Sequence, residues 1–250
     1  MDELSQGSLT LHVVALSGGK DSTAMALRLR ELNPDTPYTY VCTPTGNELP
    51  EMFAHWRKLS EMLKTPVTPV VGGTLEGIIK REQMIPNWRA RFCTRQLKIE
   101  PYAAWLMQQA RRYSRIVSYV GIRADEPERE AGDYTNVPGV EMVFPMRDWK
   151  WGLGDVWSYL AVRGVIIPTR TDCALCFFQR LPEWYALWEN YPEEWAKGEA
   201  IEAEMGHTFR SPSRDTWPAA MKDLRARFEA GDVPRGVKEP KLNACRVCRL

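Results

Sequence analysis

An apolar run that ends in a pair of glycines is the feature that most constrains how this chain folds. Residues 11–16 are mostly apolar, Gly18 and Gly19 follow, and apolar side chains then recur at helical spacing from Met25 to Leu32. This order predicts a strand, a tight loop and the N-terminus of a helix. The glycines let the backbone come close to a ligand, and the unpaired N–H groups of the first helical turn attract an anion. The stretch therefore predicts a phosphate-binding loop.

The side chains of this loop suit a polyphosphate. Lys20 adds a positive charge, and Asp21 adds a carboxylate suited to a metal ion. Hydroxyl groups lie on Ser17, Ser22 and Thr23. The loop is not a Walker A sequence, because Val14 stands where the first glycine should be and Asp21 follows the lysine. The alternative interpretation is an ordinary helix start, capped by Ser17 or Asp21.

The segment Ser-Gly-Gly-Lys-Asp-Ser resembles the PP-loop of the ATP pyrophosphatase superfamily. Enzymes of that superfamily bind ATP by its phosphates, attack the α-phosphate and release pyrophosphate. The resemblance implies ATP and Mg²⁺ as cofactors, with Lys20 and Asp21 as catalytic groups. It assigns phosphate binding to Ser17, Gly18, Gly19, Lys20, Asp21, Ser22 and Thr23.

Further strand and helix patterns follow the loop. Residues 38–42 predict a second strand, residues 52–63 a helix, residues 66–71 a third strand and residues 115–121 a further one. Repeated strand–helix units predict an α/β fold with a doubly wound, mostly parallel sheet. In such sheets ligands bind outside the carboxyl ends of the strands, where the loops at Ser17 and Thr43 both fall.

Three later blocks resemble the phosphoadenylylsulfate reductase-like family of this superfamily. Thr45-Gly46 with Pro50-Glu51 matches the family element after the second strand, although Pro44 replaces its aspartate. Gly121 to Arg129 resembles the family's Gly-x-Arg-x-x-Glu-x-x-Arg loop. The resemblance implies a HUP-type fold (adenine nucleotide alpha hydrolase-like). It adds Thr45, Gly46, Gly121 and Arg123 to the ATP site. A structural pairing of the arginines with Asp125 or Glu126 is the alternative interpretation.

The third block surrounds Cys93. Cys93, Lys98 and Pro101 match the Cys-Cys-x-x-Arg-Lys-x-x-Pro element of sulfonucleotide reductases, while Thr94 replaces the second cysteine. The resemblance implies a catalytic role for Cys93. The cations of this block and of the Gly121 loop would bind a second, anionic substrate. They are Arg91, Arg95, Lys98 and Arg129. A solvated basic loop is the alternative interpretation.

Two CxxC pairs, Cys173 with Cys176 and Cys245 with Cys248, occur in the last third of the chain. Two such pairs complete a four-sulfur tetrahedral metal site. The resemblance favours a [4Fe-4S] cluster over zinc, with Cys93 as a nearby fifth thiol. Unrelated pairs, or a single redox dithiol, remain open. The aromatic segment between the pairs, residues 177–204, is expected to pack in a core.

Composition narrows the class of protein. Of 250 residues, 44% are hydrophobic and 26% charged, which excludes wholesale disorder. A formal charge of +1 argues against a protein built chiefly to neutralise nucleic acid, although a local basic patch is compatible with it. No apolar run reaches the roughly 18 residues that span a bilayer, and no N-terminal signal is visible, so we expect a cytoplasmic protein without a membrane partner. A homodimer remains open.

These observations predict a PP-loop nucleotide-binding α/β domain over residues 1–170 and a helical extension over residues 171–250 that carries the metal site. The expected enzyme binds ATP and adenylylates an acceptor, a nucleic acid or a small molecule, for sulfur transfer or activation. A sulfur donor protein would then be a further partner. The first alternative is a sulfonucleotide reductase that uses a cysteine thiol. The second is an accessory subunit that binds ATP without turnover.

Overall fold

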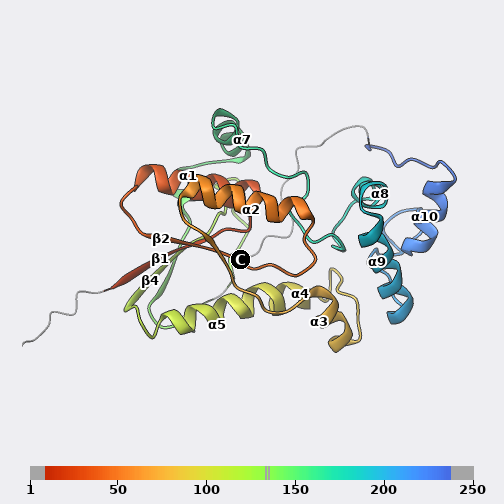
Figure 1. The fold of residues 1–250 in the computed structure, drawn as a ribbon, viewed down its shortest axis with the longest axis horizontal. Helices are drawn as coiled ribbons and strands as arrows, with labels where there is room; N and C mark the ends of the chain where they lie inside the picture. Colours follow the sequence, from red (N-terminus) through yellow and green to blue (C-terminus); the bar gives the residue numbers. More distant parts are fainter. Residues whose placement is uncertain (1–8, 133, 135, 238–250) are drawn as a thin grey trace, which may run out of the picture.

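The sheet at the centre of the fold is parallel throughout. The computed structural model describes residues 9–132, 134 and 136–237, and in this part of the chain five strands lie in the order β3-β2-β1-β4-β5 (Figure 1). Each neighbouring pair runs parallel. The strands are β1 Thr10–Ala15, β2 Tyr38–Cys42, β3 Val67–Pro69, β4 Arg115–Tyr119 and β5 Val140–Val143. The strand order reverses between β1 and β4, which makes the carboxyl ends of these two strands the switch point where ligands bind.

Helices connect the strands and cover both faces of the sheet. Figure 1 shows α1, α2 and α7 on one face and α5 on the other. The α-helices are α1 Lys20–Leu32, α2 Pro50–Leu63, α3 Leu75–Glu82, α4 Phe92–Thr94, α5 Glu100–Gln109, α6 Pro145–Asp148, α7 Leu153–Val162, α8 Leu181–Asn190, α9 Pro192–Met205 and α10 Met221–Glu229. One π-helical turn, η1 Arg95–Ile99, joins α4 to α5.

Alternate side chains of β1 enter two different cores. Val14 packs with Leu27, Leu59 and residues of α7 on one face, and Val13 packs with Leu106 of α5 on the other. Strands buried on both faces are characteristic of parallel sheets. The predicted doubly wound α/β fold is confirmed.

A third core joins the α/β part to the C-terminal helices. Leu97 and residues of α3 pack there with Leu175 and with aromatic side chains of α8 and α9. Trp184 and Trp195 are fully buried, so the aromatic segment forms a core as expected. The helical C-terminal extension is confirmed. Apolar side chains from both sides of the predicted boundary at residue 170 pack together in this core.

Some local predictions need correction. The strand β5 and the short helix α6 have no counterpart among the predicted elements. Tyr102 and Leu106 form the buried face of α5, whereas Met107 is 39% exposed. Within the described residues, no helix combines the length and the apolar character that a membrane crossing requires.

Candidate functional site

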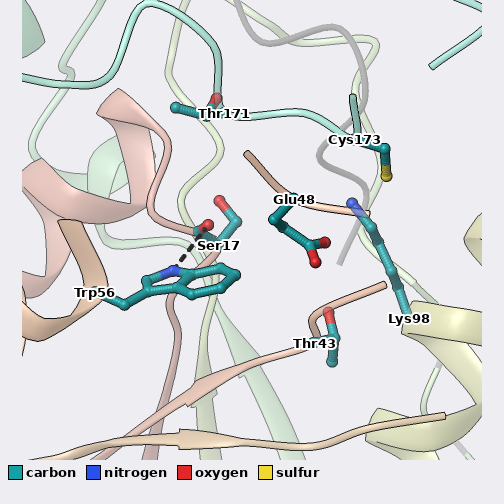
Figure 2. Close-up of a pocket in the computed structure, with 7 residues that line it drawn as sticks. All are labelled: Ser17, Thr43, Glu48, Trp56, Lys98, Thr171 and Cys173. Atoms are coloured by element: carbon teal, nitrogen blue, oxygen red, sulfur yellow. Dashed lines mark hydrogen bonds between the residues drawn. The ribbon is translucent and has the colours of Figure 1, made fainter. Parts of the chain in front are cut away.

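The PP-loop lies at the carboxyl end of β1 and packs against α2. Gly18 has φ +85°, in the left-handed region that glycine adopts without strain. A Cβ on Gly18 would lie 2.7 Å from Trp56 Nε1 and 2.8 Å from Met52 Cε, so the loop backbone packs directly on α2. Trp56 Nε1 also donates a hydrogen bond to the carbonyl oxygen of Ser17 at 3.3 Å (Figure 2). The loop therefore has a fixed shape.

The N-terminus of α1 faces the switch point without a side-chain cap among the described residues. Ser17 Oγ lies 3.0 Å from Ser22 Oγ and accepts from the N–H of Gly19 at 3.3 Å, which closes the turn without covering the helix start. Capping by Ser17 or Asp21, the alternative interpretation, is not seen. The first N–H groups of a helix have no partner within the helix and carry its positive dipole end. This end of α1 is suited to bind a phosphate.

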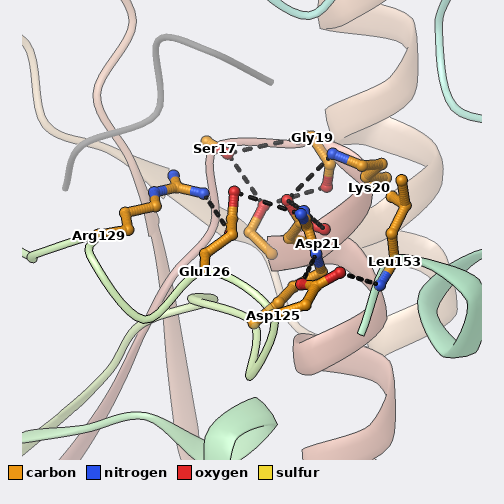
Figure 3. A network of polar contacts seen from close by, with 10 residues as sticks. Ser17, Gly19, Lys20, Asp21, Asp125, Glu126, Arg129 and Leu153 are labelled. Carbon is orange, nitrogen blue, oxygen red and sulfur yellow. Dashed lines mark hydrogen bonds and ion pairs between the residues drawn. The ribbon is translucent and has the colours of Figure 1, made fainter. Parts of the chain in front are cut away.

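A buried network of charges lies beside this helix end (Figure 3). Lys20, Asp21 and Arg123 are 3%, 5% and 4% exposed. Lys20 Nζ lies 3.1 Å from Asp21 Oδ2, and Arg123 Nη1 donates to both Asp21 oxygens at 3.1 Å. The carboxylate thus pairs with both cations and fixes their positions next to the loop.

The network continues to the surface through the loop after β4. Arg123 Nε donates to Asp125 at 2.8 Å, and Arg123 Nη2 lies 3.3 Å from Glu126. Glu126 in turn accepts from Arg129 at 3.0 Å. The pairing of both arginines with acidic residues of their own loop, given above as the alternative interpretation, is therefore present. Arg123 nonetheless lies next to the PP-loop, because it also pairs with Asp21. Arg129 contacts this network only through Glu126, which pairs with both arginines.

Gly121 explains how the two loops come together. A Cβ on this residue would lie 3.1 Å from both Cα and N of Ser22 and 3.2 Å from the carbonyl carbon of Asp21. These are main-chain atoms of the first turn of α1, which no side-chain rotation moves. Only glycine lets the chain after β4 touch the start of α1, and this contact brings Arg123 to Asp21.

A pocket next to the PP-loop combines residues from four segments of the chain. Its lining residues are Ser17, Thr43, Glu48, Trp56, Lys98, Thr171 and Cys173 (Figure 2). Glu48 Oε1 accepts from both the N–H and the hydroxyl of Thr45 at 2.7 Å. Glu48 Oε2 is buried and has no hydrogen-bond partner among the described residues. The pocket is therefore lined by the ammonium of Lys98, the thiol of Cys173 and the carboxylate of Glu48.

The loop after β2 is fastened to the segment around Cys173. Glu48 and Cys173 form an antiparallel bridge, and Thr45 Oγ1 lies 3.1 Å from Cys173 Sγ. Asn47 accepts from the N–H groups of Ala174 and Leu175, at 2.6 and 2.8 Å. The C-terminal part of the chain thus supplies one wall of the pocket.

Three thiols lie around this wall. Burial raises the pKa of Cys173 to about 11, and burial also raises the pKa values of Cys93 and Cys176. The Lys98 ammonium opposes this for both Cys93 and Cys173 by favouring the thiolate. Lys98 therefore lies close to two of the predicted reactive or ligating cysteines.

The remaining predicted residues have different surroundings. Gly46 has φ +71° and contacts Thr74, which suits a turn. Arg95 is exposed and paired with Glu100. Cys245 and Cys248 lie outside the described residues, and within the described part of the chain no three His, Cys, Asp or Glu residues form a metal-binding group.

Sequence reasoning did not single out Glu48 or Trp56. Glu48 precedes the helix predicted over residues 52–63, and Trp56 has the spacing of the apolar stripe of that helix. A signal for Glu48 was its position two residues after Gly46, in a loop already expected at the site. Trp56 gave none, because a tryptophan at helical spacing normally packs in a core.

Comparisons with known proteins identify the family of this chain. Residues 11–169 match the family described as phosphoadenosine phosphosulfate reductase domain. No curated protein matches the chain. Three solved structures are similar at low identity. Phosphoadenylyl-sulfate reductase from Candida auris, as a phosphate complex, is 14% identical with a TM-score of 0.46, over 66% of this chain and 77% of that one.

The U34-tRNA thiolase NcsA from Methanococcus maripaludis, with its [4Fe-4S] cluster, is 16% identical with a TM-score of 0.49, over 83% of this chain and 76% of that one. A predicted tRNA methyltransferase subunit from Methanocaldococcus jannaschii is 16% identical with a TM-score of 0.32, over 63% of this chain and 89% of that one. The family match includes the PP-loop, the Cys93 block and the Gly121 loop. The chain therefore belongs to the phosphoadenosine phosphosulfate reductase domain family, a branch of the PP-loop superfamily.

Proposed function

We propose that this protein is an enzyme that binds ATP at the PP-loop and adenylylates an acceptor, with release of pyrophosphate. The observation that carries the proposal is the uncapped start of α1 at the switch point of the sheet, with the buried Lys20 beside it. Reductases that take a sulfonucleotide have no pyrophosphate to bind, and their loop lacks the Lys-Asp-Ser run. The intact run from Lys20 to Ser22 therefore favours ATP as the ligand.

In the proposed reaction an acceptor oxygen attacks the α-phosphorus of ATP. A new O–P bond forms as the bond to the bridging α,β-oxygen breaks, and that oxygen leaves with its electron pair on pyrophosphate. Negative charge accumulates on the phosphates during this step. Lys20 and the N–H groups of α1 would stabilise it because both are already oriented in the folded protein. A sulfur nucleophile from a donor then attacks the carbon that bears the adenylylated oxygen, and a C–S bond forms as the C–O bond breaks and AMP leaves.

The fit of a magnesium ion to Asp21 depends on its neighbours. Both oxygens of Asp21 already pair with Lys20 and Arg123, so Mg²⁺ would bind there only in exchange for one of these cations. Glu48 Oε2 is the buried carboxylate oxygen of the pocket that has no hydrogen-bond partner in the described structure. Mg²⁺ prefers such oxygens and, when bound, would neutralise phosphate charge. Glu48 is therefore the better candidate ligand, and Asp21 the group that holds Lys20 and Arg123 in place.

The cysteine thiols decide whether an iron–sulfur cluster or a zinc ion fits this chain. Cys173 and Cys176 have the spacing of a two-thiolate chelate, and Cys93 shares the neighbour Lys98 with Cys173. A soft metal would bind thiolates, and its binding would release the protons that burial now retains. We propose a [4Fe-4S] cluster or zinc on Cys173, Cys176, Cys245 and Cys248.

One observation favours sulfonucleotide reduction as a second candidate. The thiol of Cys173 lines the same pocket as Ser17, and Lys98 lies near it. A thiol in this position would reach a ligand held by the PP-loop. An accessory subunit that binds ATP without turnover is the third candidate.

Product analysis separates the three. The protein is incubated with ATP, with tRNA and DNA supplied in turn, and separately with phosphoadenylylsulfate and a dithiol. We expect pyrophosphate from ATP, none from a Lys20→Ala variant, and no sulfite. Thiol-dependent sulfite release would establish the reductase instead, and ATP binding without either product would establish the accessory subunit.

A further inference from the structure

A cationic loop between α3 and α4 carries an exposed tryptophan at its tip. Trp88 is 61% exposed, and the guanidinium of Arg89 lies 4.7 Å from the centroid of its ring. The tip has a defined shape, because Asn87 Oδ1 accepts from the N–H groups of Arg89 and Ala90, both at 3.0 Å. The loop therefore presents a flat aromatic face together with a positive charge.

Two further arginines lie near the same loop. The guanidinium of Arg91 lies 4.9 Å from the ring of Phe178, and Arg214 donates to the carbonyl oxygens of Phe177 and Phe178 at 3.3 Å. Arginines from two separate segments thus meet at Phe178. We call Trp88, Arg89, Arg91, Phe178 and Arg214 the Trp88 surface.

This surface leads toward the pocket. Arg91 acts electrostatically on Cys93, and Lys98 acts on both Cys93 and Cys173. Lys98 also lines the pocket next to Ser17. Arg89, Arg91 and Lys98 thus belong to one segment of the chain, which starts at the exposed tip and supplies Lys98 to the pocket.

We propose that the Trp88 surface binds an unpaired stretch of nucleic acid, which is the acceptor for the adenylylation proposed above. A base would stack on Trp88, and the phosphates on either side of that base would lie on Arg89 and Arg91. Aromatic faces combined with arginines are typical of sites that bind single strands and loops. The overall charge of +1 agrees with a local binding site rather than general affinity for nucleic acid.

Fluorescence anisotropy without ATP tests the binding separately from the chemistry. Labelled single-stranded RNA, single-stranded DNA of the same sequence and duplex DNA are titrated with the full-length protein at low and at moderate salt. We expect a single strand to bind more tightly than the duplex. Trp88→Ala should weaken the binding of that strand about 10-fold or more. Arg89→Gln should reduce the slope of log affinity against log salt by about one.

Arg112→Gln is the matched control. Arg112 is exposed between α5 and β4, at the amino end of the strands and therefore opposite the site, and its loss should leave affinity unchanged. Thermal unfolding of each variant shows that it is folded. Lys20→Ala should bind single strands as the wild type does, because Lys20 lies outside the Trp88 surface. In the wild type, Trp88-dependent binding of a single strand without pyrophosphate release from ATP would uphold the nucleic-acid site and refute the proposed function.

Equal affinity of wild type and Trp88→Ala for every probe would overturn the inference. The inference would also fail if Trp88→Ala changed only the molar mass measured by light scattering and no affinity for nucleic acid. The surface would then join two copies of the chain. The RNA and DNA arms identify which polymer the site takes.

Discussion

The contact between Gly121 and the start of α1 makes a sharp prediction about the substitution Gly121→Ala. The new Cβ would lie 3.1 Å from Cα and N of Ser22. Carbon atoms in ordinary contact are about 3.5–4.0 Å apart, so the first turn of α1 or the chain after β4 must move by roughly 0.4 Å or more. Because the atoms on both sides belong to the main chain, no rotamer change relieves the clash.

The displacement should reduce both the stability of the protein and its rate of turnover. Overpacking of this kind costs about 1–3 kcal/mol in the free energy of unfolding. A 1 Å error in a positioned group costs about 100-fold in rate, so a shift near half of that should lower kcat/KM for pyrophosphate release roughly 10-fold. Urea unfolding measures the stability, and a coupled pyrophosphate assay measures the rate.

Gly154→Ala is the matched control. Gly154 is exposed at the start of α7, and a Cβ there would meet nothing within 4 Å. The same substitution should leave the rate unchanged and stabilise the protein by up to about 1 kcal/mol. Wild-type rate and stability in Gly121→Ala would refute the packing of this loop against α1.

Three further predictions concern charge and metal. Arg123→Ala should lower the free energy of unfolding by about 3 kcal/mol or more, because the buried Asp21 carboxylate loses a partner, and urea unfolding at neutral pH measures it. Burial raises the pKa of Glu202 to about 7, so the native state holds this proton more tightly than the unfolded chain. The protonated Glu202 therefore contributes its full stability below the ordinary pKa of about 4.5, and this stability is lost as the pH rises through 7. Urea unfolding at a series of pH values measures the slope, and Glu202→Gln should remove it. Persistence of the slope in Glu202→Gln would contradict the assignment. After anaerobic purification, Cys176→Ser should lose the bound iron or zinc that elemental analysis finds in the wild type, while Cys42→Ser should retain it; equal metal in both variants would contradict the ligand assignment.

Much of the α/β part of the chain could be predicted because its signals are local. The apolar run before Ser17 and the helical spacing after Lys20 each report on a few neighbouring residues, and the structure has β1 and α1 there. The parallel order followed from repeated strand–helix units. The strand β5 was missed because its four residues, Val140–Val143, form too short a run to stand out.

The assembly of the site depends on contacts between distant residues. Nothing in the sequence near Asp21 shows that Arg123, 102 positions later, donates to both of its oxygens. Likewise, the bridge between Glu48 and Cys173 joins a loop to a segment that was expected to serve only as a metal-binding extension. Motifs indicated which residues matter, and the packing of Gly121 and Asn47 decides which of them meet.

The choice of nucleotide at the PP-loop is the central claim, and calorimetric titration tests it without any acceptor. ATP with Mg²⁺ and phosphoadenylylsulfate are titrated in turn into the wild type and into the Lys20→Ala variant. We predict that the wild type binds ATP more tightly than the sulfonucleotide, and that Lys20→Ala removes this preference. Tighter binding of phosphoadenylylsulfate, unaffected by Lys20→Ala, would contradict the proposal and identify the site as that of a reductase.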